Sequence, residues 1–420
     1  MPVDYFLGID FGTSGCRCVV IDRHKTIQAQ VASPFPQQQT PQLWWSTLER
    51  NIQQLKKDID LKSIRTIAID GTSATLLLTD KQGAVVSPVL MYHDDRYHAQ
   101  AEIIKQCAPD ATLSQSANSS LAKLLYLYPR YPQAYYALHQ ADWMSNRLAG
   151  IYGYSDYNNC LKMGFDPIKK QWLPWIDKLS IPAHFFPQVN DVGSVLGQIN
   201  PQWVDKLGFN QHTYIVNGTT DSTAAFLATG ANKIGDAVTC LGSTLVFKIL
   251  GNQPINMPSL GVYSHRLGDK WLIGGASNSG GAVLRHYFSV EKMRDLTPQL
   301  ARDGFKYLDY YPLLKKGERF PFNDAEKQPY MPVIADEVQF FQALLEGMSA
   351  IEQQAYALLE KMGAPPIKRL FTTGGGSQNL VWTHKRHTLL AVPFATALNT
   401  EAAYGCALLA LKAVDKNPVA

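Results

Sequence analysis

The chain has 420 residues, of which 39 are Lys or Arg and 35 are Asp or Glu, so its formal net charge is +4. Apolar residues make up 46% of it, which allows a large core, and the length predicts two or three domains. This small charge, without Lys/Arg-rich blocks, argues against nucleic acid or an anionic membrane as the main partner. There is no stretch of 18 apolar residues and no signal-peptide pattern, and the six cysteines are too dispersed for a disulfide framework. We therefore expect a cytoplasmic globular protein.

Strands and helices are predicted to alternate along the N-terminal part, which is typical of α/β layers. Residues 5–10 are apolar and residues 16–22 alternate, and the glycine-rich turn between them predicts a β-hairpin. Thr40 and Pro41 suit a helix start, and apolar residues spaced three and four apart continue the pattern to Ile59. Further strands are expected over 64–70, 75–79 and 84–86.

A second strand-turn-strand starts near Ala237, and a long helix is expected after Asp336, whose side chain suits an N-cap. A strand over 368–373 then leads into three glycines. Residues 401–414 form an alanine-rich helix with small residues on one side, which favours close packing. The aromatic and proline-rich segment 110–210 does not give a reliable order of elements.

The first hairpin turn reads GIDFGTSG and has the residue types of a phosphate-binding loop. Gly12 and its neighbouring glycines let backbone N–H groups converge, and the hydroxyl groups of Thr13 and Ser14 add donors. Asp10, at the strand end, suits a hydrated Mg²⁺ ion, and Arg17 follows as a further phosphate contact. The alternative is an ordinary hairpin turn. The chain contains neither a GxxxxGK[ST] loop nor a GxGxxG strand-to-helix junction.

Two more glycine turns and one acid complete the pattern. Residues 241–244 repeat the first turn in the other half of the chain, and residues 374–376 join a strand to a helix. Three glycines allow a flat ligand to approach the backbone, and a helix N-terminus favours anions. Asp221 follows a strand and begins a helix of small residues. It is either a helix cap or, in a cleft facing a nucleotide, a general base.

The order of the segments GIDFGTS, NGTTDSTAA, LGST, GGGSQN and EAAYGCALLA closely resembles the FGGY carbohydrate kinases, which belong to the actin-like, ribonuclease-H-like ATPases. The resemblance runs from Gly8 to about residue 411. It implies a two-domain α/β fold with a shared βββαβαβα core and with ATP and a sugar in a central cleft. We expect the N-terminal domain, with the sugar and the first phosphate loop, over 1–226, with 402–420 packing back on it. We expect the nucleotide-binding C-terminal domain over 227–401.

The same resemblance assigns roles to individual residues. Asp221 matches the catalytic base that accepts the proton of the attacking hydroxyl, and Mg²⁺ near Asp10 would bridge the phosphates of ATP. The matching loop residues are Asp10, Gly12, Thr13 and Ser14 in the first phosphate loop, Gly242, Ser243 and Thr244 in the second, and Gly375, Gly376 and Asn379 in the adenosine motif.

Three departures from the family limit what the resemblance implies. The chain is shorter than most members, Tyr126 replaces the tryptophan of the first signature, and 382–387 lacks the usual acidic residues. These differences leave the catalytic elements intact but weaken any inference about assembly, so either a monomer or a homodimer is expected.

The acceptor pocket is expected around Thr72, Ser73 and Asp94. Thr72 and Ser73 align where glycerol kinases have an arginine-glutamate pair and xylulokinases have larger residues. Small neutral hydroxyl groups suit a neutral pentose. Asp94, in YHDDR, resembles the WNDQR segment of the family. The alternatives are an ordinary turn at Thr72–Ser73 and a capped turn at Asp94, and Asp221 would also touch the sugar.

The segments GTSATLL and LMYxD resemble those of a short bacterial and plant branch of the family that is associated with D-ribulose kinase activity. This favours transfer of the γ-phosphate of ATP to the 5-hydroxyl of D-ribulose. D-xylulose, which differs at one stereocentre, is the first alternative, and L-ribulose, polyols and glycerol stay open. A hypothesis of another class is an actin-like ATPase that acts as a sensor or chaperone.

Overall fold

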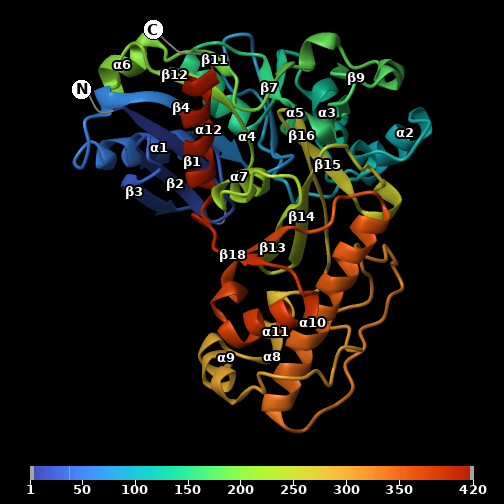
Figure 1. Cartoon of the computed structure of the whole chain (residues 1–420). Helices are drawn as coiled ribbons and strands as arrows, with labels where there is room; N and C mark the ends of the chain where they lie inside the picture. The colour runs from blue at the N-terminus through green and yellow to red at the C-terminus, as the bar shows by residue number, and fades with distance from the viewer. Residues whose placement is uncertain (1–3, 37, 417–420) are drawn as a thin grey trace. The chain divides into compact units, whose positions relative to one another are not determined.

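The computed structural model describes residues 4–36 and 38–416, and the chain divides into two compact units (Figure 1). Unit 1 runs to residue 228 and takes in the residues from 401 onward, and unit 2 comprises residues 229–400. Each unit has its own six-stranded sheet and its own hydrophobic core. Among the described residues, no helix has both the length and the apolar character that crossing a membrane requires.

Unit 1 places its main sheet between helices. The strands of unit 1 are β1 (Tyr5–Phe11), β2 (Gly15–Ile21), β3 (Ile27–Pro34), β4 (Ile64–Gly71), β5 (Leu76–Thr79), β6 (Tyr136–His139), β7 (Tyr154–Asp156), β8 (Phe165–Asp166), β9 (Gln171–Trp172), β10 (Gln188–Asn190), β11 (Val195–Gln198) and β12 (Tyr214–Thr220). Its helices are α1 (Pro41–Leu55), α2 (His98–Cys107), α3 (Ser120–Leu127), α4 (Gln140–Ala149), α5 (Tyr157–Cys160), α6 (Pro201–Leu207), α7 (Asp221–Ala228) and α12 (Ala402–Lys416).

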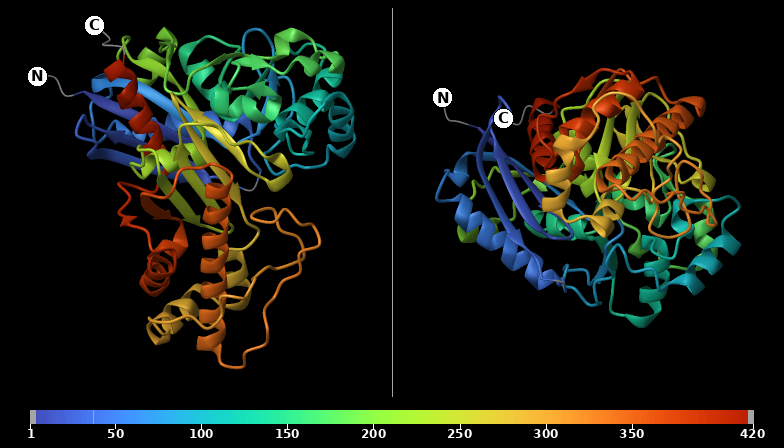
Figure 2. Two further views of the ribbon diagram at one scale, coloured as in Figure 1. Left: turned by 45° about the vertical axis from the view of Figure 1, so that its right-hand side comes forward. Right: turned by 90° about the horizontal axis from the view of Figure 1, so that it is seen from below.

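The main sheet of unit 1 has the order β11-β12-β4-β1-β2-β3, with β1, β4 and β12 parallel. Consecutive residues of a strand point to opposite faces, so both faces of β1 can be buried. Leu7 joins the core beneath α1 and α4, whereas Phe6 joins the core beneath α7 and α12. Figure 2 shows α12, in red, lying along these strands.

The contact of α12 with unit 1 depends on glycines. A Cβ atom at Gly8 of β1 would lie 1.9 Å from the Ala403 carbonyl oxygen, and one at Gly405 would lie 1.9 Å from the Ala224 carbonyl oxygen. Any larger residue would therefore push the helix off the sheet or off α7. The predicted close packing of the small-residue helix is confirmed, and the helix begins at Ala402.

Unit 2 repeats the same plan with fewer additions. Its strands are β13 (Asp236–Leu241), β14 (Leu245–Gly251), β15 (Tyr263–Leu267), β16 (Lys270–Ala276), β17 (Arg369–Thr373) and β18 (Phe394–Ala395). Its helices are α8 (Gly281–Tyr287), α9 (Val290–Leu296), α10 (Glu337–Lys361) and α11 (Leu380–Leu390). The sheet order is β15-β16-β14-β13-β17-β18, with β13, β17 and β18 parallel.

Most of the predicted elements are confirmed at their expected places. Thr40 caps α1 by accepting the Leu43 N–H at 3.1 Å, although α1 ends before Ile59. Asp336 caps α10 by accepting the Gln339 N–H at 2.8 Å. The predicted strand over 84–86 is wrong, because only Val85 forms an isolated bridge there.

Candidate functional site

The β1–β2 turn exposes the hydroxyl side chains of Thr13 and Ser14, while its backbone is held from several sides. The Gly12 N–H donates to the Gly15 carbonyl at 3.0 Å, and the Gln39 side chain donates to the Thr13 carbonyl at 2.8 Å. The turn is therefore ordered and presents its donors to solvent. This arrangement suits a phosphate group.

Three carboxylates lie where the parallel strands of unit 1 end. Asp10 on β1 is directly opposite Asp70 on β4, and Asp70 is opposite Thr219 on β12. Asp221 is the first residue of α7, one position after β12. Ligands of open α/β sheets bind at this carboxyl edge. The structure brings the predicted residues Asp10 and Asp221 to one edge and adds Asp70, which the sequence analysis treated only as the end of a strand.

Asp10 and Asp70 are buried without enough positive charge to balance them. Burial raises the pKa of Asp10, although its hydrogen bond with Asp70 and the charge of Arg17 act in the opposite direction. Burial, the charge of Asp10 and the hydrogen bond between the two side chains raise the pKa of Asp70 well above its usual range. Arg17 lies 3.4 Å from Asp10, and the Cys406 thiol donates to Asp70 at 3.1 Å.

The Asp10–Asp70 pair fits a divalent cation. The Oδ1 atom of each side chain is buried and has no hydrogen-bond partner among the described residues. Those residues also contain no group of three or more His, Cys, Asp or Glu side chains able to hold a metal ion. Mg²⁺ usually keeps several waters and takes only one or two protein carboxylates together with phosphate oxygens. The pair matches that requirement.

Asp221 is half-buried at the start of α7, where its Oδ1 accepts the Ser222 N–H at 2.6 Å. An N-cap side chain accepts the N–H two or three residues further on, so the capping hypothesis rests on the position of Asp221 at the start of α7 and not on this contact. A helix N-terminus also favours the ionised carboxylate, which is the form a general base needs. Asp221 contributes to the raised pKa of Asp70, so the three acids interact electrostatically. The geometry therefore accommodates both hypotheses for Asp221.

The hydroxyl group of Thr72 makes hydrogen bonds to other residues of the protein. Its Oγ1 donates to Gln140 Oε1 at 2.9 Å and lies 2.6 Å from Thr75 Oγ1, and its side chain is buried. The adjacent Ser73 is half-buried and has no hydrogen bond to another described residue. Of the two predicted sugar contacts in this turn, Ser73 has the free hydroxyl group.

Gln140, at the start of α4, is a buried residue that the sequence analysis missed. Its Oε1 accepts from the N–H and the hydroxyl of Thr72, whereas its Nε2 has no partner among the described residues. It lies in the segment that gave no reliable element order. Gln140 stands between His139 and Ala141, and this local pattern gives no signal of a site.

Asp94 is an ionised carboxylate with local partners. It accepts two hydrogen bonds from the Arg96 guanidinium, both at 2.8 Å, and one from the Tyr97 hydroxyl at 2.9 Å. The Arg96 hydrogen bond is the main reason why the pKa of Asp94 falls to about 2. Nearby, Tyr92 contacts the first phosphate turn, because Thr13 Oγ1 donates to its hydroxyl at 3.2 Å.

Unit 2 contains the second predicted loop, and α8 begins directly against it. The N–H groups of Gly281 and Ala282 donate to the carbonyls of Gly242 and Ser243 at 2.8 and 3.0 Å. Arg285 of α8 donates to Ser243 Oγ at 2.8 Å. Ser243 is exposed, and Thr244 is half-buried. Arg285 therefore places a positive charge beside this turn, and the sequence analysis did not identify it. A usable signal was present, because Arg285 follows a strand and two glycines.

The glycine triplet after β17 forms a 3-10 turn over Gly375–Gln378 before α11 begins. Asn379 caps α11 by accepting the Trp382 N–H at 2.9 Å, and its Nδ2 donates to Thr297 at 3.1 Å. A Cβ atom at Gly376 would lie 2.6 Å from the Trp382 ring. Glycine is required at this point because the backbone passes so close to the ring.

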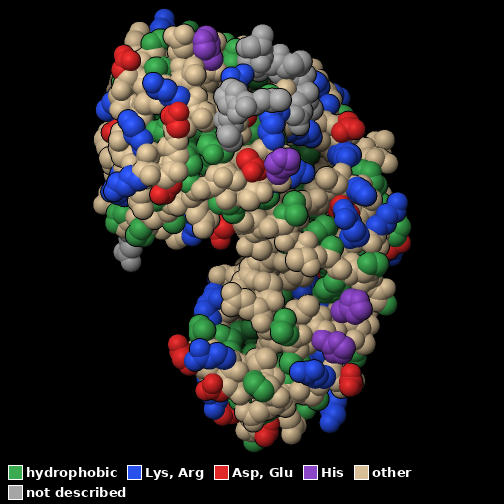
Figure 3. Space-filling model, turned by 60° about the vertical axis from the view of Figure 1, so that its left-hand side comes forward, with side chains coloured by type: hydrophobic (Ala, Val, Ile, Leu, Met, Phe, Trp, Pro, Cys, Tyr) green, Lys and Arg blue, Asp and Glu red, His purple; other side chains and the backbone are tan. Residues whose placement is uncertain are grey.

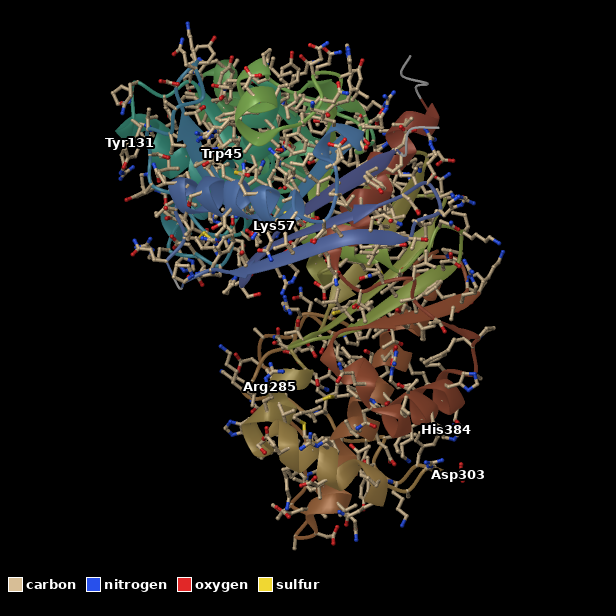
Figure 4. All side chains as sticks on the ribbon, turned by 90° about the vertical axis from the view of Figure 1, so that its left-hand side faces the viewer. Trp45, Lys57, Tyr131, Arg285, Asp303 and His384 are labelled. Atoms are coloured by element: carbon tan, nitrogen blue, oxygen red, sulfur yellow. The ribbon has the colours of Figure 1, made fainter. Side chains whose placement is uncertain are left out.

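These two loops border a cavity of about 780 Å³ that lies wholly within unit 2. Its lining includes Gly242, Ser243, Gly375, Gly376 and Asn379, so five predicted residues meet here. Figure 3 shows hydrophobic side chains between Lys and Arg side chains on this unit, in the lower part of the view, and Figure 4 labels Arg285 on α8. The apolar lining includes Leu284, Met293, Phe341, Leu345 and Trp382, with Arg285 and Arg294 among the polar residues. The volume lies in the range of small-molecule sites, and cations beside an apolar floor suit a nucleotide.

Comparisons with known proteins show which family both halves of the chain match. Residues 5–228 match the model of the N-terminal domain of the FGGY family of carbohydrate kinases, and residues 237–414 match the model of its C-terminal domain. The xylulose kinase of Escherichia coli (strain K12) is 20% identical over 404 residues, covering 90% of this chain and 83% of that protein.

Two solved structures are similar in fold over nearly the whole chain. A protein described as a xyloylose kinase from Brucella ovis has a TM-score of 0.88 at 22% identity, with 99% of this chain and 92% of that chain covered. A gluconate kinase from Lactobacillus acidophilus has a TM-score of 0.85 at 19% identity, with 99% and 90% covered. Because such different substrates occur on one fold, the fold alone does not select the acceptor.

Proposed function

The chain belongs to the FGGY family of carbohydrate kinases, and we propose that it transfers the γ-phosphate of ATP to the 5-hydroxyl group of a ketopentose. Kinases of this family use ATP, generally with Mg²⁺. The observation that supports the proposal most strongly is the edge of unit 1, where Asp10 and Asp70 lie near the ends of two parallel strands and Asp221 directly follows a third. A metal-binding pair and a candidate base are thus built beside the acceptor turn Thr72–Ser73.

Asp221 would act as the general base. Phosphoryl transfer depends mainly on positioning and charge stabilisation, and the protein has to accept one proton from the attacking hydroxyl. The N-terminus of α7 would keep Asp221 ionised, and the half-buried side chain is open to a ligand. Ser73 and the ionised Asp94 would orient the other hydroxyl groups of the sugar.

Asp10 and Asp70 would hold Mg²⁺, in large part through water, with Arg17 as a further cation beside them. When bound, Mg²⁺ neutralises the charge of the phosphates. The turn containing Gly12, Thr13 and Ser14 would donate hydrogen bonds to phosphate oxygens.

The nucleotide contacts of unit 2 would come from both of its glycine turns. Gly242, Ser243 and Thr244 would contact phosphates, with Arg285 supplying positive charge beside Ser243. The cavity next to Gly375, Gly376 and Asn379 would take the adenosine, because its apolar floor suits a flat base.

We propose D-ribulose as the first candidate acceptor. The segment GTSATLL and the small neutral side chains of Thr72 and Ser73 support this choice. D-xylulose is the second candidate, favoured by the name of the Escherichia coli relative. The two sugars differ at one hydroxyl stereocentre, so a single hydrogen bond can decide between them.

The test is ADP release measured with D-ribulose, D-xylulose, L-ribulose, glycerol and no sugar, followed by ³¹P NMR of the product. We expect strong stimulation by one ketopentose and a phosphate ester at its 5-hydroxyl. Stimulation by glycerol alone would contradict a ketopentose acceptor. Stimulation by unfolded peptide instead of any sugar would contradict the kinase assignment.

A further inference from the structure

Lys123 of α3 is fully buried, and its Nζ joins the two loops that the proposed function places around the acceptor. Nζ donates to the Ala74 carbonyl at 2.8 Å and to the Met91 carbonyl at 2.8 Å. Ala74 directly follows Ser73, and Met91 lies three residues before Asp94. We propose that Lys123 is a positioning residue that fixes the separation of these two loops and thereby sets the affinity and selectivity for the acceptor sugar. The inference rests on the proposed function of the loops.

Ala74 needs such support because its backbone is strained. Its φ is +68°, in the left-handed region that residues other than glycine rarely occupy. The side chain of Ala74 is buried, so the turn cannot relax into solvent. The hydrogen bond from Lys123 to its carbonyl stabilises this conformation, and the conformation in turn determines where the Ser73 hydroxyl lies.

The two loops also contact each other at other points. Leu76 and Leu90 form a backbone bridge, and Thr75 Oγ1 accepts the Tyr92 N–H at 3.0 Å. Thr75 lies 2.6 Å from Thr72, which is held by Gln140. Lys123 adds a further connection, because its Nζ bonds the Ala74 carbonyl and the Met91 carbonyl at the same time. Removing Nζ would leave the buried Ala74 carbonyl without a donor among the described residues, whereas the Met91 carbonyl would still accept the Asp94 N–H at 3.0 Å.

Lys123 bonds backbone carbonyls and not a carboxylate, so its role is not that of an ion-pair partner. No carboxylate of the described residues lies within ion-pair distance of its Nζ. Burial, together with the charge of Lys162, lowers the pKa of Lys123 to about 7, although the charge of Asp94 opposes this shift. The ammonium has three N–H donors and the neutral amine has two, so both forms can bond the two carbonyls. The two hydrogen bonds from Lys123 Nζ are therefore expected to persist both below and above pH 7.

A purely structural lysine and a positioning lysine predict different kinetics. Loss of a structural residue would lower the melting temperature and the amount of active enzyme, with equal effects on all substrates. Loss of a positioning residue would change the KM for the sugar, leave the KM for ATP unchanged and alter the preference between two ketopentoses. The KM split and the selectivity are therefore the measurements that decide between them.

The experiment compares Lys123→Met, which keeps the length but removes every donor, with Lys162→Met as the matched control. For Lys123→Met we expect the KM for the ketopentose to rise about tenfold or more, because the buried Ala74 carbonyl loses its donor and the Nζ link from Ala74 to Met91 is lost. We expect kcat and the KM for ATP to change by less than about threefold, and the ratio of kcat/KM for D-ribulose to that for D-xylulose to shift. Lys162→Met is expected to leave the sugar KM unchanged.

A second variant tests the proposed link to Ala74 and covers the case in which Lys123→Met folds poorly. Ala74→Gly removes the side chain that makes the positive φ costly, so Lys123→Met should have a smaller effect on the sugar KM in the Ala74→Gly background than alone. Lys123→Arg, which keeps donors, should retain more of the selectivity than Lys123→Met. An unchanged sugar KM and unchanged selectivity in a folded Lys123→Met would overturn the inference. Absence of sugar-stimulated ADP release in the wild type would instead overturn the proposed function.

Discussion

The two units pair their central strands in the same way, but they carry different residues at equivalent positions of those strands. In unit 1, β1 pairs antiparallel with β2 and parallel with β4; in unit 2, β13 pairs antiparallel with β14 and parallel with β17. The penultimate residue of β1 is Asp10, opposite Asp70 of β4. The penultimate residue of β13 is Cys240, opposite Thr373 of β17. A repeated framework thus carries the acid pair in one copy only.

The two units also differ in whether their buried carboxylates have cationic partners. In unit 2, Lys385 lies 2.9 Å from Glu346. Burial alone would raise the pKa of Glu346, but the hydrogen bonds from Lys385 and other donors outweigh it and hold that pKa below its usual value. In unit 1, Asp10 and Asp70 have raised pKa values, and the Oδ1 atom of each has no hydrogen-bond partner among the described residues. Glu346 is thus paired with a buried cation of the protein, whereas we propose that the Asp10–Asp70 pair is completed by a bound ion.

The largest expected effect concerns stability and comes from unit 2. Arg386 makes two hydrogen bonds of 2.6 Å to Glu352, and both side chains are buried. Arg386→Met would leave that carboxylate without its cation, so we expect a loss of about 3–5 kcal/mol in the free energy of unfolding. Urea denaturation measures it. Lys292→Met, which removes an exposed pair with Glu337, should cost less than about 1 kcal/mol, and equal losses would contradict the contrast.

The next effect concerns catalysis in unit 1. Asp221→Asn keeps the shape of the side chain but cannot accept the proton, so we expect kcat to fall at least about a hundredfold. Single-turnover phosphorylation measures the rate, and equilibrium binding of ATP and sugar serves as the control, which should stay near the wild-type value. A variant that retains a third of the wild-type rate would show that Asp221 only caps α7.

The matched positions Asp10 and Cys240 allow a direct test of the acid pair. Asp10→Asn should raise the Mg²⁺ concentration needed for half-maximal rate by roughly tenfold, because a metal held through ordered partners loses about this much when one is removed. Cys240→Ser, at the equivalent position of unit 2, should leave the Mg²⁺ requirement unchanged. A Mg²⁺ titration of both variants is the measurement, and equal shifts would mean that the two strand ends do not differ in metal binding.

A smaller effect is expected at the acceptor turn. Ser73→Ala would leave a sugar hydroxyl without its partner, which should lower kcat/KM at least about fivefold for the preferred ketopentose. The KM for ATP should hardly change. Steady-state kinetics with D-ribulose and D-xylulose test this, and equal losses for both sugars would remove the reason for placing D-ribulose first.

The last expected effect is a change in the pH dependence of stability. Burial, and then the charge of Asp142, raise the pKa of Asp156 to about 7, whereas an unfolded aspartate titrates near 4. Between about pH 4 and 7 the unfolded state has lost this proton and the folded state keeps it, so stability falls as pH rises. Asp156→Asn should flatten that decline.

The measurement for Asp156→Asn is the melting temperature across the same pH range. The substitution is expected to be accommodated, because Asn159 donates to Asp156 through Nδ2 and its Oδ1 is free of partners among the described residues. A flipped Asn159 amide could then accept from the new side chain. A variant with the wild-type pH profile would show that Asp156 does not titrate in this window.

The sequence was sufficient for the elements whose signals are local. The hairpins, the caps at Thr40 and Asp336 and the α12 helix all depend on residues next to one another in the chain. The glycine turns that we propose to bind phosphate could be located for the same reason. Their glycines and hydroxyls lie within a few positions of each other.

Features that depend on distant residues could not be predicted. Asp70 becomes part of an acid pair only because β4 aligns with β1, and Gln140 meets Thr72 across 68 residues. Arg285 reaches Ser243 only once α8 is in place. The predicted strand over 84–86 was wrong because local β-propensity indicates an extended segment but not whether a partner strand runs beside it.

The packing of α12 determines the order in which this chain can mature. Its residues contact β1, β4 and α7, and Cys406 supplies the donor to Asp70. During synthesis the N-terminal strands leave the ribosome first, but the helix that covers them arrives only after all of unit 2 has been made. Unit 2 can close its own core while unit 1 waits with one face of its sheet exposed. The nascent protein therefore acquires the final surroundings of Asp70 only after unit 2 has been made.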